Sequence, residues 1–249
     1  ESPAAAEVCA ANGIHVRIFE SLRPTPELSF AVREYDCQAG INVTASHNPK
    51  EYNGYKVYWS DGAQLPPQHA AAIARELEQI DIFTGIRRME FDDAKAQGLI
   101  EIMGAETDER FMSHVMAMVN DRESMAKVAD TFHMVYTPFH GCGWKLVPEA
   151  LRGLGVKHLH CVPEQMVLDG NFPTVVSPNP ENPEGFYLAV DLAKKKGADF
   201  ILGSDPRRRP GRHHGAHLRR GVQGAHRQPD RRAAAGLPDR CQAPHRQDA

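Results

Sequence analysis

The sequence predicts an α/β protein: two consecutive α/β domains, each a mixed sheet flanked by helices, followed by a disordered tail. Short segments with helical spacing alternate with short β-type segments, and this alternation restarts near residue 120. Such alternation is typical of sheets whose faces are covered by helices. The composition then changes abruptly after Pro206. The predicted segments are 1–120, 121–206 and 207–249.

The first domain begins with an alanine-rich helix that ends at Gly13. Thr25 is a plausible N-cap for the next helix, with Pro26 at its first position. Residues 81–105 are less regular than the segments around them. The predicted helices are 3–13, 25–37, 66–80 and 107–119, and the predicted strands are 14–19, 39–46 and 55–59.

The second domain repeats the same order of elements, with a Pro-, Asn- and Gly-rich loop, DGNFPTVVSPNPENPEG, over residues 169–185. If a strand that followed Asp205 is missing, we expect the edge of the second sheet to be exposed. The predicted strands are 132–138, 156–163 and 198–204, and the predicted helices are 145–155 and 186–197.

Charge and cysteine content narrow the class of protein. Residues 1–206 carry a net charge of −11, whereas residues 207–249 carry eleven arginines, no lysine and three acids, a net +8. An acidic body argues against a general nucleic-acid surface there. Five cysteines without a C-x-x-C pair indicate a reducing compartment, so we expect a cytoplasmic protein. No apolar run reaches the roughly 18 residues of a membrane helix, so no membrane partner is expected.

The stretch VTASHNPKEYNGYK, residues 43–56, places Ser46 and His47 where a strand enters a turn. By residue chemistry alone this is an ordinary polar turn rich in Asn, Pro and Gly. A serine hydrolase needs a base held against the serine, but adjacent strand residues point in opposite directions. The stretch also lacks a G-x-S-x-G turn, which disfavours that class further.

The same string resembles the phosphoserine loop of the α-D-phosphohexomutases, the phosphoglucomutase/phosphomannomutase family. TASHNP is followed by NGYK, which puts Lys56 ten residues after Ser46, and RPTPELSFAV and VVSPNPENPEG fit in order. The resemblance runs across residues 1–206 and is strongest to the phosphoglucomutase-2/phosphopentomutase-like branch.

The resemblance implies a phosphoryl relay on a phosphosugar substrate, which is a glucose, mannose or pentose phosphate. A phosphorylated Ser46 donates its phosphoryl group to a sugar monophosphate, which gives a bound bisphosphate. This bisphosphate then returns its other phosphate to the serine. Lys56 would be the nearby cation or proton carrier, and His47 would contact the phosphoryl group or the sugar. His140 and Gly141, in TPFHGCG, match a family loop without an assigned chemical role.

The resemblance also implies a Mg²⁺ site. In the family the strand matching ADFILGSDP ends in a D-x-D-x-D-R loop, and the metal also binds a phosphoserine oxygen, here that of Ser46. Asp205 matches the first aspartate, but the next four residues after Pro206 are Arg-Arg-Arg-Pro. One hard carboxylate is a poor cage for Mg²⁺.

The tail suggests a shifted reading frame near Pro206. Residues 207–249 lack Ile, Phe, Tyr, Trp, Met, Glu, Lys, Ser, Thr and Asn, unlike ordinary disordered segments. One permitted codon choice for this stretch, read one base later, gives D-A-D-R-V-A-I-M-V-R, which restores the loop. Two alternatives are a basic arm that binds nucleic acid and a zinc site. The zinc site would use histidines without a matching Cys or acid pattern, namely His213, His214, His217 and His226.

We therefore expect a fragment of a Mg²⁺-dependent phosphosugar mutase that is itself inactive. The first residue is Glu, and the resemblance implies upstream strands with an active-site arginine and downstream domains for sugar specificity and distal phosphate binding. A frameshift near Pro206 would explain the loss of the metal loop. Neither the particular sugar phosphate nor the oligomeric state follows from the sequence.

Overall fold

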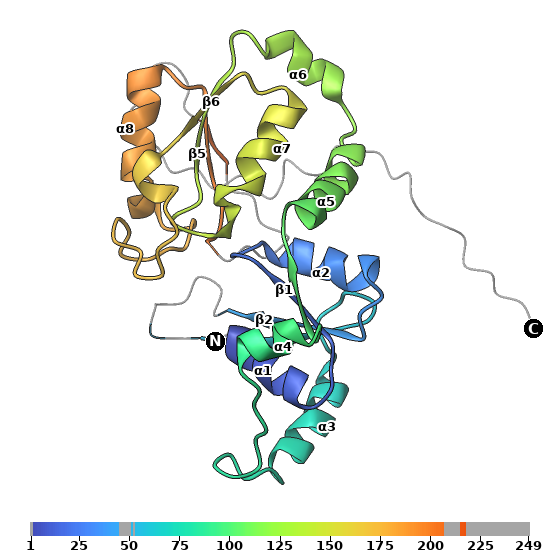
Figure 1. Cartoon of the computed structure of the whole chain (residues 1–249). Coiled ribbons are helices and arrows are strands. Elements are labelled where there is room, and N and C mark those ends of the chain that lie inside the picture. The colour runs from blue at the N-terminus through green and yellow to red at the C-terminus, as the bar shows by residue number, and fades with distance from the viewer. Residues whose placement is uncertain (1, 45–50, 52, 207–214, 218–249) are drawn as a thin grey trace, which may run out of the picture. The chain divides into compact units, whose positions relative to one another are not determined.

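The computed structural model describes residues 2–44, 51, 53–206 and 215–217 (Figure 1). No helix within these ranges is long and apolar enough to cross a membrane. The helices of the first half are α1 (Ser2–Ala11), α2 (Thr25–Glu34), α3 (Pro67–Leu77), α4 (Phe91–Ala96) and α5 (Ala105–Ala117). Its strands are β1 (Val16–Phe19), β2 (Ala39–Val43), β3 (Tyr55–Trp59) and β4 (Ile100–Met103).

The strands of the first half form two pairs. Strand β1 is parallel to β4, with Val16 opposite Ile100, and β2 is antiparallel to β3, with Ala39 opposite Trp59. Helices α1 and α4 pack against the β1–β4 pair through a small apolar core made of Ala6, Ala10, Ala94 and Ile100. Alanine at these positions brings helix and strand backbones close together.

Two features of the first half differ from the sequence prediction. Residues 81–105, whose sequence is less regular and for which no element is predicted, contain α4 and β4. Helix α2 begins at Thr25 with Pro24 as its N-cap, and no side chain caps it. The Thr25 hydroxyl instead accepts a hydrogen bond from the Asn42 amide at 2.8 Å, so a tertiary contact replaces the predicted local cap.

The second half contains a four-stranded sheet in the order β6-β5-β7-β8. Strand β5 is parallel to both β6 and β7, and β7 is antiparallel to β8. The remaining helices are α6 (Arg122–Val128), α7 (Leu146–Leu154) and α8 (Tyr187–Lys196), with 3₁₀ turns η1 (Cys142–Trp144), η2 (Pro163–Gln165) and η3 (Pro183–Phe186). The strands are β5 (His133–Thr137), β6 (His158–Cys161), β7 (Phe200–Gly203) and β8 (Gly215–His217).

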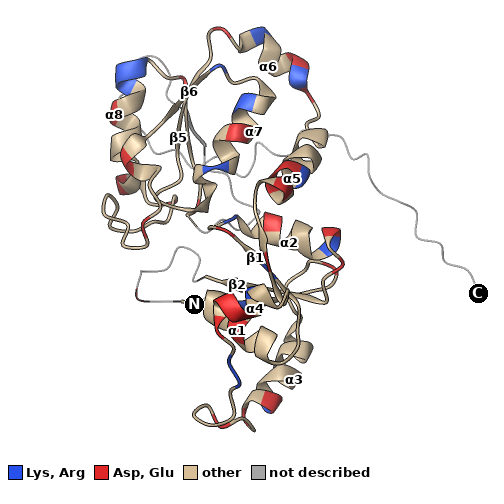
Figure 2. Ribbon diagram, in the orientation of Figure 1, with Lys and Arg blue, Asp and Glu red and all other residues tan. Residues whose placement is uncertain are grey.

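Helix α8 covers this sheet, and its buried face, its last turn and the glycine after it explain why this segment forms a helix. Its buried alanines join a core made of Val135, Val162, Ala189, Ala193 and Ile201. Three lysines fill its last turn and form the basic end of α8 in Figure 2. Their positive charges interact favourably with the negative end of the helix dipole. Gly197 then takes a left-handed conformation, with φ of 62°, and ends the helix as the sequence KKKG predicts.

Strand β8 corrects one expectation. The edge of the second sheet next to Asp205 was expected to be exposed, but Gly215–His217 pairs with residues 200–202 of β7 along that edge. Strand β8 also lies within the segment that the sequence predicts to be a disordered tail. The zinc candidates His213, His214 and His226 lie outside the described residues, as do 207–214 and 218–249 generally.

Candidate active site

The β2–β3 hairpin carries the turn predicted to hold the phosphoserine. Asn42 is paired with Lys56, and the Thr44 amide donates to the Gly54 carbonyl at 2.7 Å. Antiparallel pairing therefore continues to the residues on both sides of the turn. Ser46 and His47 lie outside the described residues, so their roles stay predictions.

Lys56 lies half-buried on β3 and lines a cleft of about 1150 Å³. Most of the other residues that line this cleft come from α2, α5 and α7, and they are largely apolar. Thr25, at the start of α2, lines it too and is held to β2 by its bond with Asn42. The hairpin and the start of α2 thus place Lys56 beside this cleft, and its role as a substrate-binding residue stays a prediction.

Asp205 follows β7 at the carboxyl edge of the second sheet, which is where ligands bind in open α/β sheets. The Ser204 amide donates to the Thr137 carbonyl at 3.0 Å, and the Ser204 and Tyr136 hydroxyls are 2.8 Å apart. Asp205 itself is half-buried. It does not line the cleft that contains Lys56, so the described residues do not bring the two predicted site residues into one cavity.

The FHGCG loop after β5 supports the segment that contains Asp205. Phe139 and His140 have left-handed backbones, with φ of 46° and 62°. The Cys142 amide donates to the Pro206 carbonyl at 2.7 Å. A Cβ atom on Gly141 would lie 1.9 Å from the Pro206 Cα, so only glycine allows this approach. The loop therefore fixes the backbone immediately after Asp205.

His140, to which sequence reasoning assigned no role, is a structural link between two loops. Its side chain is buried, with Nδ1 2.9 Å from the Val167 carbonyl and Nε2 2.8 Å from the Thr174 hydroxyl. Because a carbonyl only accepts, Nδ1 carries a proton. The Gln165 side chain also donates to Thr174, at 3.0 Å. This buried network holds the 163–175 loop against the end of β5.

Replacing His140 by alanine is expected to destabilise the chain by about 2–3 kcal/mol, because a buried side chain is removed and the Val167 carbonyl and the Thr174 hydroxyl each lose a hydrogen-bond partner. Urea unfolding measures this loss, and amide hydrogen exchange should increase first in residues 166–175. His15→Ala is the matched control, since His15 is exposed. A loss no larger than that of the control would contradict the structural role.

The residues that the structure describes do not fit the implied Mg²⁺ site. Within 2–44, 51, 53–206 and 215–217, no group of three His, Cys, Asp or Glu side chains could hold a metal ion. The stretch DPRRRP, residues 205–210, contributes one carboxylate and three cationic side chains. Mg²⁺ demands near-octahedral oxygen ligands and loses water reluctantly. Asp205 alone is therefore an incomplete site.

Comparison with family models assigns both halves of the chain. Residues 2–82 match phosphoglucomutase/phosphomannomutase α/β/α domain I, and residues 109–207 match α/β/α domain II of the same family. The boundary predicted near residue 120 stays a prediction. Asp205 falls within the second match, and Ser46 and Lys56 fall within the first.

Similar proteins agree with this assignment. The chain is 36% identical over 201 residues to a phosphoglucomutase of Staphylococcus saprophyticus, covering 81% of this chain and 36% of the relative. It is 36% identical over 207 residues to a Staphylococcus aureus (strain MRSA252) phosphoglucomutase, covering 81% of this chain and 35% of the relative. The chain thus spans about a third of the length of these relatives.

The fold agrees as well. A Thermus thermophilus protein described as a phosphomannomutase aligns with a TM-score of 0.62 at 22% identity, over 80% of this chain and 41% of that one. A phosphoglucomutase/phosphomannomutase family protein of Burkholderia thailandensis aligns with a TM-score of 0.56 at 19% identity, over 80% and 39%. Two matched domains, in order, together with these relatives, show that the chain belongs to the phosphoglucomutase/phosphomannomutase family of phosphosugar isomerases.

Proposed function

We propose that the chain is part of a mutase that interconverts a sugar 1-phosphate and a 6-phosphate, or a pentose 1-phosphate and a 5-phosphate. The observation that carries this proposal is the match to both family domains, with the sequence TASHNP between β2 and β3. The phosphoglucomutase-2/phosphopentomutase-like branch and a cytoplasmic location belong to the same proposal. The described residues do not distinguish glucose, mannose and pentose phosphates.

In the proposed reaction a sugar hydroxyl oxygen attacks the phosphorus on Ser46, and the bond from phosphorus to the Ser46 oxygen breaks. The hydroxyl proton passes to the Ser46 oxygen, with Lys56 as the proposed proton carrier. The product is a bound bisphosphate, whose other phosphoryl group then returns to Ser46. Positioning and charge neutralisation supply most of the catalysis in such transfers. Lys56 is suited to neutralising phosphoryl charge because it lies on β3, just beyond the turn, beside the cleft. His47 is proposed to contact the phosphoryl group or the sugar.

Mg²⁺ is the proposed cofactor of the longer enzyme, where it would withdraw charge from the phosphoryl oxygens. Asp205 and a phosphoserine oxygen would be among its ligands. Since residues 205–210 provide one carboxylate, we propose that the chain with the printed sequence is inactive. The alternative of a basic nucleic-acid-binding arm gains no support from the described residues, which exclude nearly all of that segment.

The test is to sequence the source DNA across the codons for Ser204 to Arg212 and to express the intact gene, with its upstream and downstream codons, in both reading frames. The frame that restores D-P-D-A-D-R should convert a sugar 1-phosphate and carry phosphate on Ser46. Its Ser46→Ala variant should lose at least about 1,000-fold in rate, since the relay has no other acceptor. The chain as printed should show no turnover. A restored frame without turnover, or turnover that survives Ser46→Ala, would overturn the proposal.

A further inference from the structure

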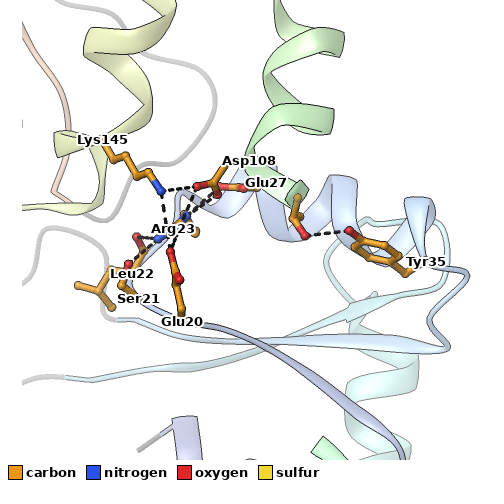
Figure 3. Close-up of polar contacts among 9 residues, drawn as sticks. Glu20, Ser21, Leu22, Arg23, Glu27, Tyr35, Asp108 and Lys145 are labelled. Carbon is orange, nitrogen blue, oxygen red and sulfur yellow. Dashed lines mark hydrogen bonds and ion pairs between the residues drawn. The ribbon is translucent and has the colours of Figure 1, made fainter. Parts of the chain in front are cut away.

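An ionic cluster with a buried centre lies where α2, α5 and the segment before α7 meet (Figure 3). The Arg23 side chain is 1% exposed and donates to both carboxylate oxygens of Asp108, at 2.6 and 2.9 Å. Lys145 donates to the same carboxylate at 2.6 Å. Asp108, on the first turn of α5, therefore holds a cation from each half of the chain.

A second acid completes the charge balance of this cluster. Arg23 also contacts Glu20 at 2.9 Å, and the Lys145 nitrogen lies 3.8 Å from the same Glu20 oxygen. Two cations thus face two carboxylates, those of Glu20 and Asp108. Any further negative charge in the cluster would have no matching cation among these residues.

Glu27, on α2, is the fifth ionisable group, and it is placed as a neutral acid would be. It is fully buried, and neither of its carboxyl oxygens accepts a hydrogen bond. The Arg23 nitrogen nearest to it is 3.9 Å away and already bonded to Asp108. Ionising the Glu27 carboxyl in this position would cost several kcal/mol. Burial removes the water that would hydrate the carboxylate, and no hydrogen-bond donor of the protein takes its place.

The neighbour of Glu27 is the Asp108 carboxylate, because both face the Arg23 Nε nitrogen, at 3.9 and 2.6 Å. An Asp108 carboxylate can only accept a hydrogen bond. Two ionised carboxylates in contact repel each other. A proton on Glu27 turns the same contact into a short charge-assisted hydrogen bond, and it satisfies the group that otherwise has no partner.

We propose that Glu27 holds a proton at neutral pH and donates it to Asp108, and that this proton maintains the contact of Asp108 with Arg23 and Lys145. Glu27 is then a positioning residue: it acts through Asp108 on the two cations. Helix α5 is fixed to α2 and to the start of α7 while the proton is present, and the attachment weakens when the proton leaves.

The charges around Glu27 set the pH at which Glu27 loses its proton. Burial and the neighbouring Asp108 raise the pKa of Glu27 to about 8, while Arg23 and Lys145 act in the opposite direction. Burial raises the pKa of Asp108, but hydrogen bonds from Arg23 and Lys145 outweigh it and lower that pKa. Glu20, next to Arg23, is the remaining charged group of the cluster.

The sign of the pH dependence follows from the raised pKa. The folded chain holds the Glu27 proton more tightly than the unfolded chain, whose glutamates titrate near 4.5. The contribution of Glu27 to stability is therefore fully present below about pH 4.5 and is lost as pH rises through about 8.

Glu27→Gln isolates the contribution of the Glu27 proton to the pH dependence of stability. Glutamine keeps the shape of the side chain and a hydrogen-bond donor, but it cannot lose a proton. We expect the unfolding free energy of the parent chain, measured in urea from pH 5.5 to 9, to fall with a slope that the variant lacks. Glu34→Gln is the matched control: it makes the same change on α2 at a Glu that is ion-paired with Arg110. It should keep the parent slope.

Carboxyl-detected NMR of the unaltered chain tests the proton directly and needs no variant to fold. One glutamate side-chain resonance should titrate near pH 8, with an Asp108 signal shifting at the same midpoint. The proposal is overturned if every glutamate titrates below about pH 6, or if the slope of Glu27→Gln matches that of the parent chain and of Glu34→Gln.

Discussion

The combined change Arg207→Asp, Arg208→Ala, Arg209→Asp and Pro210→Arg is expected to raise the affinity for Mg²⁺ by at least about 100-fold. Two carboxylates are added after Asp205, so that acids stand at alternate positions 205, 207 and 209 in the sequence, and the three-arginine run, which would repel the ion, is removed. Isothermal titration with MgCl₂ measures the gain. It tests whether the metal site of the family was lost through these four residues alone.

The control for this prediction removes charge without adding ligands. Arg207→Gln, Arg208→Gln and Arg209→Gln together should raise Mg²⁺ affinity only slightly, because Mg²⁺ prefers carboxylate oxygens. Asp205→Asn in the four-residue variant should then reverse most of the gain. Equal affinity in the glutamine control and in the carboxylate variant would show that repulsion, and not missing ligands, limits binding.

Gly141→Ala is expected to destabilise the chain by about 3 kcal/mol or more, the range of severe overpacking. The added Cβ would lie 1.9 Å from the Pro206 Cα and 2.2 Å from its carbonyl oxygen. Both are backbone atoms, so no side-chain rotation relieves the contact. The hydrogen bond from Cys142 to Pro206 would have to break, and urea unfolding at neutral pH measures the cost.

Gly170→Ala is the matched control for this substitution. Gly170 lies in the loop after η2, and a Cβ there would meet nothing within 4 Å. We expect a change of less than about 0.5 kcal/mol, as at other surface positions. If both alanine variants unfold at the same urea concentration, the close approach of the FHGCG loop to Pro206 is wrong.

Much of the fold could be predicted from local pattern. The α/β alternation and α5 follow from spacing that spans several turns or a complete strand, and the family follows from motifs in order along the sequence. Strand β4 could not be predicted in this way. It has four residues, and it is defined by parallel pairing with β1, which lies more than 80 residues earlier.

The candidate site, too, could be predicted only in part from the sequence. Ser46, His47, Lys56 and Asp205 could be named because the residue order itself carries the motif, and the roles of all four stay predictions. His140 looked like part of a motif without a role. Its role depends on Val167 and Thr174, which reach it only when the 163–175 loop folds back.

The sequence by itself determined the fold class, the family and the absence of two carboxylates after Asp205, since these depend on residue types in order. The tertiary structure alone decided the protonation of Glu27 and the requirement for glycine at position 141. Burial and the approach of Asp108 set the charge of Glu27, and the position of Pro206 sets the space at Gly141. Desolvation, like steric exclusion, depends on residues distant in sequence that become neighbours only in the folded chain.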